Sequence, residues 1–515
     1  MAVFLFQGLL PALYFSGFLL ALALPRHSWP IALGTAFTAF LYSLAGFPVA
    51  LFGLAEYPYE IHSASMLVAI LVAGLGVVII RFASRYLQGE PRQEIFVRAI
   101  LFTLACVSLL VLSRHLMVMV VAWSAVSFGL HYLLTFYHER KTAQIVAHKK
   151  FIVSRLADLC LLGALLLIYQ TTGDLTLDGL HRSLAGLASL PAPLHLAACL
   201  FALAAILKSA QLPLHGWVIQ VMEAPTPVSA LLHAGIVNIG GLVMIKLGEL
   251  LALAPIAQAL LIIVGSSTAV LAGLVMLTRI SIKVRLAWST CSQMGFMLME
   301  VGLGLYELAL LHLVAHSLYK AHAFLSTGNA VTEARMRDFM PDASAAHSIS
   351  GYLFAAVMSG SVVLGVSWIG QALLPSLVLP PLAVFIMAVG LAPLLWTGPA
   401  SGIADLGRNL LRVFGLSLLY LVWHGIFSGL TPAAQVSFSG WWVVVALMLG
   451  ALYFMQVWLR AYPQGKLAKL IYPWAYNGFY LDESFTRLAF RLWPLQLSPA
   501  QARTQVNRHF ITQEH

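Results

Sequence analysis

The chain has 515 residues, of which 60% are hydrophobic and only 9% are charged, and its mean hydropathy is +0.89. Because soluble proteins carry about a quarter charged residues, this composition excludes a soluble globular enzyme and a disordered chain. The formal net charge of +10 does not indicate nucleic-acid binding, since the basic residues fall between apolar segments, where the positive-inside rule accounts for them.

Apolar segments recur along the whole chain, and each is long enough to cross a bilayer as a helix of about 20 residues. Their number, about fifteen, predicts an all-α polytopic membrane protein. The connecting segments alternate in charge, since one carries Arg140 and Lys141 and the next carries Asp174 and Asp178. By the positive-inside rule, this alternation predicts an N-terminus outside and a C-terminus in the cytoplasm.

The chain divides into four predicted parts. Residues 1–115 form N-terminal transmembrane helices, 116–335 a core, 336–460 C-terminal transmembrane helices, and 461–515 an interfacial or cytoplasmic segment. In the last part, aromatic residues around Trp474 alternate with polar ones, which favours an amphipathic segment lying at the membrane surface. A docking surface for a cytoplasmic partner is the alternative interpretation.

A lysine stands beside a predicted helix break. Lys208 ends an apolar segment, and Pro213 removes a backbone donor five residues later. Non-helical backbone at membrane depth is found inside protein or along a water-filled cavity, and Glu223 follows in the same segment. A buried lysine can release a proton, which arginine hardly can, so we favour proton transfer over a lysine that only reaches the membrane surface.

A row of titratable residues occupies a later helix. His312, His316 and Lys320 are spaced by four residues and therefore share one helix face. The row fits a proton wire better than a zinc site, because no carboxylate or cysteine nearby in the sequence supplies the remaining ligands. Hydrogen bonding with a purely structural role remains the alternative.

A further histidine, His233, lies early in the helix after the break. Alone it is weak evidence, since lone buried histidines are usually core residues. Lys246 and Glu249, at the far end of the same helix, are expected to anchor it at the membrane interface.

Together these clusters resemble the antiporter-like subunits of the complex I and Mrp antiporter superfamily, over residues of about 60 to 335. The matching segments are 208–213, 224–233, 283–295 and 312–326. The resemblance implies an antiporter-like fold with broken seventh and twelfth helices, and it implies proton translocation by the core.

The resemblance also implies roles for individual residues. The proton path would comprise Lys208, His233, His312, His316 and Lys320. Charge-tuning residues would be Arg155, Asp158, Glu223 and Lys283.

Two departures from the family pattern stand out. The fifth helix of the family carries a Trp-Glu pair, whereas this chain has Trp123-Ser124, and the twelfth helix, at residues 352–369, lacks the usual lysine or glutamate. Asp158 is a possible replacement for the missing fifth-helix carboxylate, if it lies close to Lys208.

Residues 130–137 and 149–158 are similar to one branch, the membrane subunit of DAB-type inorganic-carbon accumulation complexes. This resemblance implies a subunit of the bacterial inner membrane that is not itself an enzyme and holds no cofactor. It implies a large cytoplasmic DabA-type partner with a zinc site like that of β-carbonic anhydrase. Ion flow through the membrane subunit would drive CO2 hydration or bicarbonate accumulation in that partner.

Two alternative functions remain open. The chain could belong to an NADH–quinone oxidoreductase, a hydrogenase or an Mrp-type antiporter assembly, although the two missing charges count against this. It could also be a membrane anchor that conducts nothing.

Overall fold

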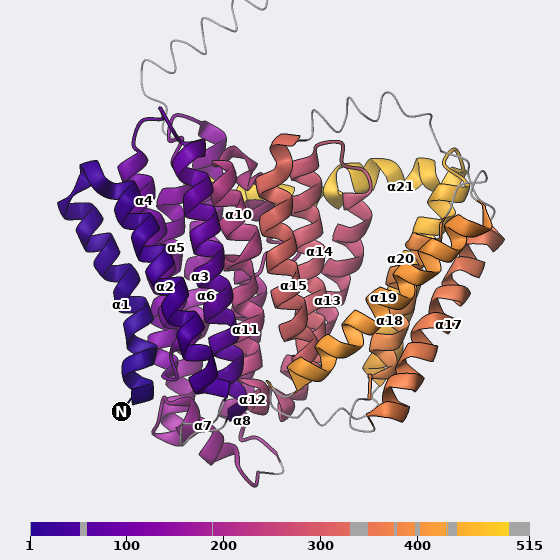
Figure 1. Cartoon of the computed structure of the whole chain (residues 1–515), viewed down its shortest axis with the longest axis horizontal. Helices are drawn as coiled ribbons and strands as arrows, with labels where there is room; N and C mark the ends of the chain where they lie inside the picture. The colour runs from indigo at the N-terminus through magenta and orange to yellow at the C-terminus, as the bar shows by residue number, and fades with distance from the viewer. Residues whose placement is uncertain are drawn as a thin grey trace, which may run out of the picture.

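The computed structural model describes residues 2–51, 59–187, 189–329, 349–374, 378–396, 402–428, 430 and 440–493. The regular elements in these ranges are α-helices and short 3-10 helices, and most of the long helices stand side by side (Figure 1). The chain enters α1 at one face of the bundle, and α21 lies across the opposite face (Figure 1). We call these the N-terminal face and the α21 face.

The first part of the bundle consists of apolar helices joined by short connections. They are α1 (Ala2–Ala23), η1 (Pro25–His27), α2 (Ser28–Leu51), α3 (Tyr59–Tyr86), α4 (Gln93–Leu112), α5 (Leu116–Leu134), α6 (Lys141–Thr172), α7 (Leu177–Leu184) and α8 (Ala192–Lys208). Local residues set the ends of these helices. Gly173 terminates α6 in the left-handed conformation. The Thr176 hydroxyl caps α7 by accepting a hydrogen bond from the Gly179 amide at 2.9 Å.

The middle of the chain contains two broken crossings. Its elements are α9 (Gly216–Ile219), η2 (Gln220–Glu223), α10 (Thr226–Ala234), η3 (Ile236–Asn238), α11 (Ile239–Lys246), α12 (Gly248–Ala252), α13 (Pro255–Met276), α14 (Ile282–Gly302), α15 (Tyr306–Leu325) and η4 (Ser326–Asn329). α8 ends at Lys208, as Pro213 predicts. A second interruption, at Gly235 between α10 and α11, is not apparent from any proline in the sequence.

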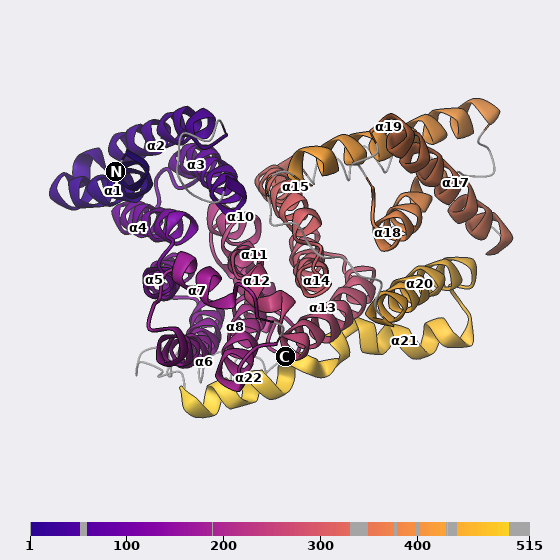
Figure 2. The ribbon, with the colours of Figure 1, turned by 90° about the horizontal axis from the view of Figure 1, so that it is seen from below.

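The last part comprises α17 (Ile349–Leu373), α18 (Pro381–Leu391), η5 (Ala392–Leu395), α19 (Ile403–Ser428), α20 (Gly440–Ala461), α21 (Lys466–Tyr476), η6 (Gly478–Tyr480) and α22 (Leu481–Leu492). α17 corresponds to the twelfth crossing, and it runs from Ile349 to Leu373 without the break that the resemblance implies. α19 lies obliquely and reaches α15 near the N-terminal face (Figures 1 and 2).

The number of crossings agrees with the sequence analysis. In the described part of the chain, ten helices are long and apolar enough to span a membrane, and three shorter apolar helices accompany them. α14 and α15 have 21 and 20 residues but carry more polar side chains. The ten, the three and these two make fifteen, and the protein is a multi-pass, all-helical membrane protein.

Two glycines allow α13 and α14 to pack closely. A Cβ on Gly265 would lie 2.6 Å from the Gly295 carbonyl oxygen, and a Cβ on Gly295 would lie 2.5 Å from the Gly265 carbonyl oxygen. Small residues at such a contact let two membrane helices approach through their backbones. The contact holds α14 in place, and α14 packs against α15, which carries His312, His316 and Lys320.

The amphipathic segment predicted from residue 461 onward is present as α21 and α22, which run across the ends of α13 and α6 (Figure 2). Residues 494–515 of this segment lie outside the described residues. Its main anchor is Lys149, whose buried Nζ donates to both carboxylate oxygens of Asp482, at 2.7 and 2.6 Å, and to the Thr486 hydroxyl at 2.9 Å.

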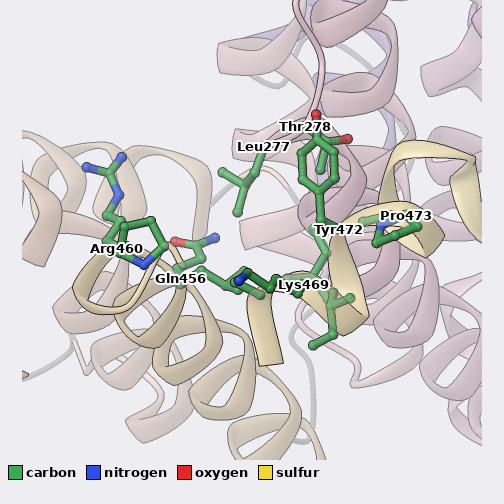
Figure 3. A pocket seen from close by; sticks show the side chains of 13 residues that line it. Leu277, Thr278, Gln456, Arg460, Lys469, Tyr472 and Pro473 are labelled. Carbon is green, nitrogen blue, oxygen red and sulfur yellow. The ribbon is translucent and has the colours of Figure 1, made fainter. Parts of the chain in front are cut away.

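An apolar pocket of about 710 Å³ lies between α13, α20 and α21. Figure 3 shows Leu277, Gln456 and Lys469 on three of its sides. None of the predicted path residues lines this pocket, so it is not the candidate functional site.

Candidate ion path

The break after α8 lies inside the protein. Lys208 is 4% exposed, and its Nζ donates to Asp158 Oδ1 on α6 at 2.7 Å and to the Trp123 carbonyl on α5 at 3.4 Å. The same Nζ lies 5.0 Å from the centre of the Trp123 ring. The carboxylate absent at Ser124 is thus supplied by a different helix, at the distance of a direct ion pair.

Asp158 is shared by several cations. Its Oδ2 lies 2.7 Å from the Arg155 guanidinium, one helical turn earlier on α6. Lys150, which the sequence analysis did not select, is also buried; it donates to the Ser154 hydroxyl at 2.7 Å and interacts electrostatically with Lys208, Asp158 and Arg155. We call Lys208, Asp158, Arg155 and Lys150 the lysine cluster.

The backbone of the break is held by polar contacts. The Leu212 amide donates to the Thr268 hydroxyl at 3.2 Å, and the Gln211 side chain donates to the Ser209 carbonyl at 2.8 Å. His215, a second residue missed from the sequence, is 1% exposed and lies against Trp288, with ring centres 4.8 Å apart. The break is therefore the buried, non-helical segment that Pro213 predicts.

His233 on α10 meets the row on α15. Its ring is fully buried and stacks on Phe324 at 4.4 Å, and neither ring nitrogen has a hydrogen-bond partner within the protein. It interacts electrostatically with Lys320, whose Nζ donates to the Leu286 carbonyl at 3.0 Å and to the Ser289 hydroxyl on α14.

The rest of the row continues along α15 toward the N-terminal face. The His316 and His312 rings are 6.0 Å apart, and both ring nitrogens of His316 lack a protein partner. His312 Nδ1 lies 2.9 Å from Glu300 Oε2 on α14. We call His233, Lys320, His316, His312 and Glu300 the histidine row.

Small polar residues lie between the lysine cluster and the histidine row. A Cβ on Gly240 of α11 would lie 2.2 Å from the Ser209 hydroxyl, so this hydroxyl approaches α11 closely. Asn238, at the start of α11, donates to the Ser317 hydroxyl of α15 at 2.7 Å. Buried polar side chains therefore lie beside α11 on two sides, Ser209 next to Lys208 and Asn238 against Ser317 of α15.

Two expected charge-tuning residues lie elsewhere. The ion pair that Glu223 makes is with Arg140, at 3.8 Å, and the Glu223 side chain is 40% exposed. Lys283 donates to the Thr226 hydroxyl at 2.9 Å. Glu223 therefore pairs just before the start of α6, and Lys283 contacts the start of α10. Arg155 and Asp158, in contrast, lie beside Lys208.

Lys246, which is expected to anchor its helix at the membrane interface, is enclosed by protein. Lys246 is 3% exposed, and its Nζ donates to the carbonyls of Val111 at 2.5 Å and Ser113 at 3.1 Å. It thereby satisfies carbonyls at the C-terminal end of α4, where the helix dipole favours a cation. Glu249 is at the surface, 3.7 Å from His181.

Glu300 is a further candidate path residue, which its sequence setting could have indicated. It is 7% exposed and lies in an apolar part of α14, and a carboxylate in such a segment is expensive unless it has a partner. Within the described ranges, histidine, cysteine and acidic side chains form no group of three that could hold a metal ion.

Comparisons with known proteins identify the family of the chain. Residues 113–377 match the family described as "NADH:quinone oxidoreductase/Mrp antiporter, TM". The chain is 40% identical over 502 residues to the probable inorganic carbon transporter subunit DabB of Hydrogenovibrio crunogenus, covering 95% of this chain and 94% of the relative. It is 37% identical over 466 residues to the probable subunit DabB2 of Halothiobacillus neapolitanus, covering 88% and 83%.

A solved structure shares the fold. The Mrp complex from Dietzia sp. DQ12-45-1b matches 99% of this chain with a TM-score of 0.65 and 21% identity, and the match spans 62% of the Mrp chain. The fold is therefore antiporter-like. The full-length identity to its relatives shows that the chain belongs to the DabB subunits of inorganic carbon transporters, within the NADH:quinone oxidoreductase/Mrp antiporter family.

Proposed function

We propose that this chain is the proton-conducting membrane subunit of a two-part inorganic-carbon uptake complex. Proton flow through its core, residues 116–335, would drive CO2 hydration or bicarbonate accumulation in a cytoplasmic zinc-containing subunit that resembles β-carbonic anhydrase. The observation that carries the proposal is the buried ion pair of Lys208 with Asp158, at 2.7 Å beside a broken helix.

The lysine cluster is suited to exchanging a proton. One carboxylate, Asp158, faces three cationic groups within the protein interior, so the cluster carries an excess of positive charge when all three are protonated. A lysine that gives up its proton relieves this repulsion, whereas Arg155 keeps its charge. Lys208 and Lys150 are therefore the groups that can change their protonation state.

The histidine row is suited to carrying the proton onward. Imidazole both accepts and donates protons, and the ring nitrogens of His233 and His316 have no competing protein hydrogen bond. Buried polar atoms are nearly always partnered, so free nitrogens on two neighbouring histidines favour a transfer role over a structural one. Ser209, Asn238 and Ser317 provide the polar connection from Lys208.

The partner would sit at the α21 face. Basic residues at this end of the bundle include Arg81, Arg85 and Arg140, and the positive-inside rule therefore favours a cytoplasmic α21 face and an outer N-terminal face. The relatives come from bacteria, which favours the bacterial inner membrane.

The test uses cells that depend on the intact complex for inorganic-carbon uptake. Lys208→Ala should abolish uptake driven by an imposed proton gradient while the partner still co-purifies. Lys208→Arg should also abolish it, because charge persists and proton release does not. Arg182→Ala, which alters an exposed basic residue of α7 away from the α21 face, serves as the control.

The outcomes separate the candidate functions. Full uptake in Lys208→Ala with an intact complex would contradict conduction and favour a membrane anchor. Uptake that stops with respiratory inhibitors although the proton gradient is maintained would favour a redox-driven complex. Co-purification of a zinc-bearing partner without flavin or iron–sulfur clusters would support the inorganic-carbon assignment.

A further inference from the structure

The histidine row ends at the carboxylate of Glu300, for which the proposed function gives no role. Glu300 is buried in α14, and among the described residues it pairs with His312 at 2.9 Å. A buried carboxylate that contacts a histidine can accept and return a proton, so Glu300 can exchange a proton with His312. The question is where a proton at Glu300 would go next.

A second carboxylate–histidine pair lies close by. Glu307, in the first turn of α15, has its Oε1 3.4 Å from Nδ1 of His424 on α19. The His424 side chain is 4% exposed, whereas that of Glu307 is 23% exposed. Glu307 therefore has one side against a buried histidine and another open to the surroundings.

Tyr420 lies near both pairs. It precedes His424 by one helical turn on α19, packs against the buried cluster that contains Leu305 and Leu308, and interacts electrostatically with both Glu300 and Glu307. Glu300 comes from α14 and Glu307 from α15, so a side chain from a third helix lies close to the junction of the two helices that carry the carboxylates. A phenol hydroxyl both donates and accepts a hydrogen bond, which suits a bridging position.

The course of α19 places this group at the N-terminal face. α15 begins there, and the oblique α19 brings its last turns to the same place (Figures 1 and 2). The other described C-terminal crossings, α17, α18 and α20, contain no aspartate, glutamate, lysine or histidine. The oblique α19 thus brings the titratable side chain of His424 next to α15.

We propose that Glu300, Tyr420, Glu307 and His424 form the half of the proton path between His312 and the N-terminal face. Glu307 exchanges protons with water at that face, Glu300 exchanges them with His312 Nδ1, and the Tyr420 hydroxyl relays between the two carboxylates. His424 positions Glu307 and balances its charge. This inference rests on the proposed function, because it extends the same path.

The test measures proton entry into vesicles that contain the whole complex and an internal pH-sensitive dye. Glu300→Gln and Glu307→Gln should each slow gradient-driven proton entry by about tenfold or more, since a positioned proton-transfer group contributes about a hundredfold or more to a rate. Glu307→Asp should recover part of the rate. Glu249→Gln is the matched control, because Glu249 is a partly exposed glutamate on α12, paired with His181 at 3.7 Å and not part of the row.

Lys208→Ala measured in the same vesicles separates the two proposals. If it blocks proton entry while both glutamine variants conduct at the wild-type rate, the outer half-path is refuted and the proposed function stands. If Lys208→Ala itself conducts normally, both fail. Because Glu307 is partly exposed, Glu307→Gln is expected to assemble, so it decides the proposal even where Glu300→Gln does not assemble.

Discussion

Asp158 Oδ1 lies 2.7 Å from Lys208 Nζ, although the two residues are 50 positions apart and belong to different helices. The family pattern expects the carboxylate partner on the fifth helix, next to Trp123, where this chain has Ser124. The Trp123 carbonyl still contacts the same Nζ at 3.4 Å. Lys208 therefore still contacts the fifth helix at Trp123, and its carboxylate partner comes from α6.

The first prediction concerns this pair. Asp158→Asn leaves the Lys208 ammonium buried without a carboxylate, and removing one partner of a buried pair costs about 3–5 kcal/mol. We expect a lower unfolding temperature of the detergent-solubilised complex and loss of driven uptake. Ser124→Glu in the Asp158→Asn background should restore part of both, because position 124 is next to the carbonyl that contacts Lys208. A double variant no better than Ser124→Gln/Asp158→Asn would show that the carboxylate position is not interchangeable.

The second prediction concerns Lys246. Lys246→Met removes the donor to the carbonyls of Val111 and Ser113, and a buried acceptor left unpaired costs about 1–3 kcal/mol. Thermal unfolding should shift to lower temperature while uptake per assembled complex stays unchanged. Lys469→Met, at an exposed site on α21, is the stability control. Loss of uptake without loss of stability would assign Lys246 to the ion path instead.

The third prediction concerns the α13–α14 contact. Gly265→Ala places a Cβ 2.6 Å from the Gly295 carbonyl oxygen, so the two helices must separate, at a cost of about 1–3 kcal/mol. Gly273→Ala on the same helix is the control, because the nearest atom to its Cβ would be a side-chain carbon at 3.5 Å. Thermal unfolding of the two variants should differ clearly, and equal unfolding temperatures would contradict the close contact.

The fourth prediction concerns the attachment of α22. Asp482→Asn weakens the bonds to the buried Lys149, and we expect α22 to exchange its amide hydrogens faster and to be cleaved sooner by protease. Glu483→Gln, which alters only an exposed pair with Arg487, should leave both rates unchanged. Identical protection in the two variants would show that α22 is held by other contacts.

The fifth prediction is a pH effect at the N-terminal face. Hydrogen bonds from the Thr176 amide and hydroxyl, at 2.8 and 2.9 Å, lower the pKa of Asp174 below its ordinary value of 3.8. The stabilisation is therefore complete above pH 3.8 and is lost as the pH falls through the lowered pKa. The protection of amides at the start of α7, after correction for the intrinsic exchange rate, should fall in that range, and Asp174→Asn should remove this fall.

The sequence by itself determined the helices, the break after Lys208 and the shared face of His312, His316 and Lys320. These features depend on local properties, namely the length of an apolar segment, the missing amide of proline and the helical repeat, and the structure has them where the residues predict them.

Only the tertiary structure decided which charges meet. Asp158 with Lys208, Glu300 with His312 and Glu307 with His424 are pairs between separate helices. It also placed Glu223 at the surface and Lys246 in the interior, contrary to their apparent setting. The physical reason is that helical periodicity specifies the face on which a side chain lies, whereas its neighbours depend on how helices pack. In this chain the packing is set by contacts such as Gly265 against Gly295 and by the oblique course of α19.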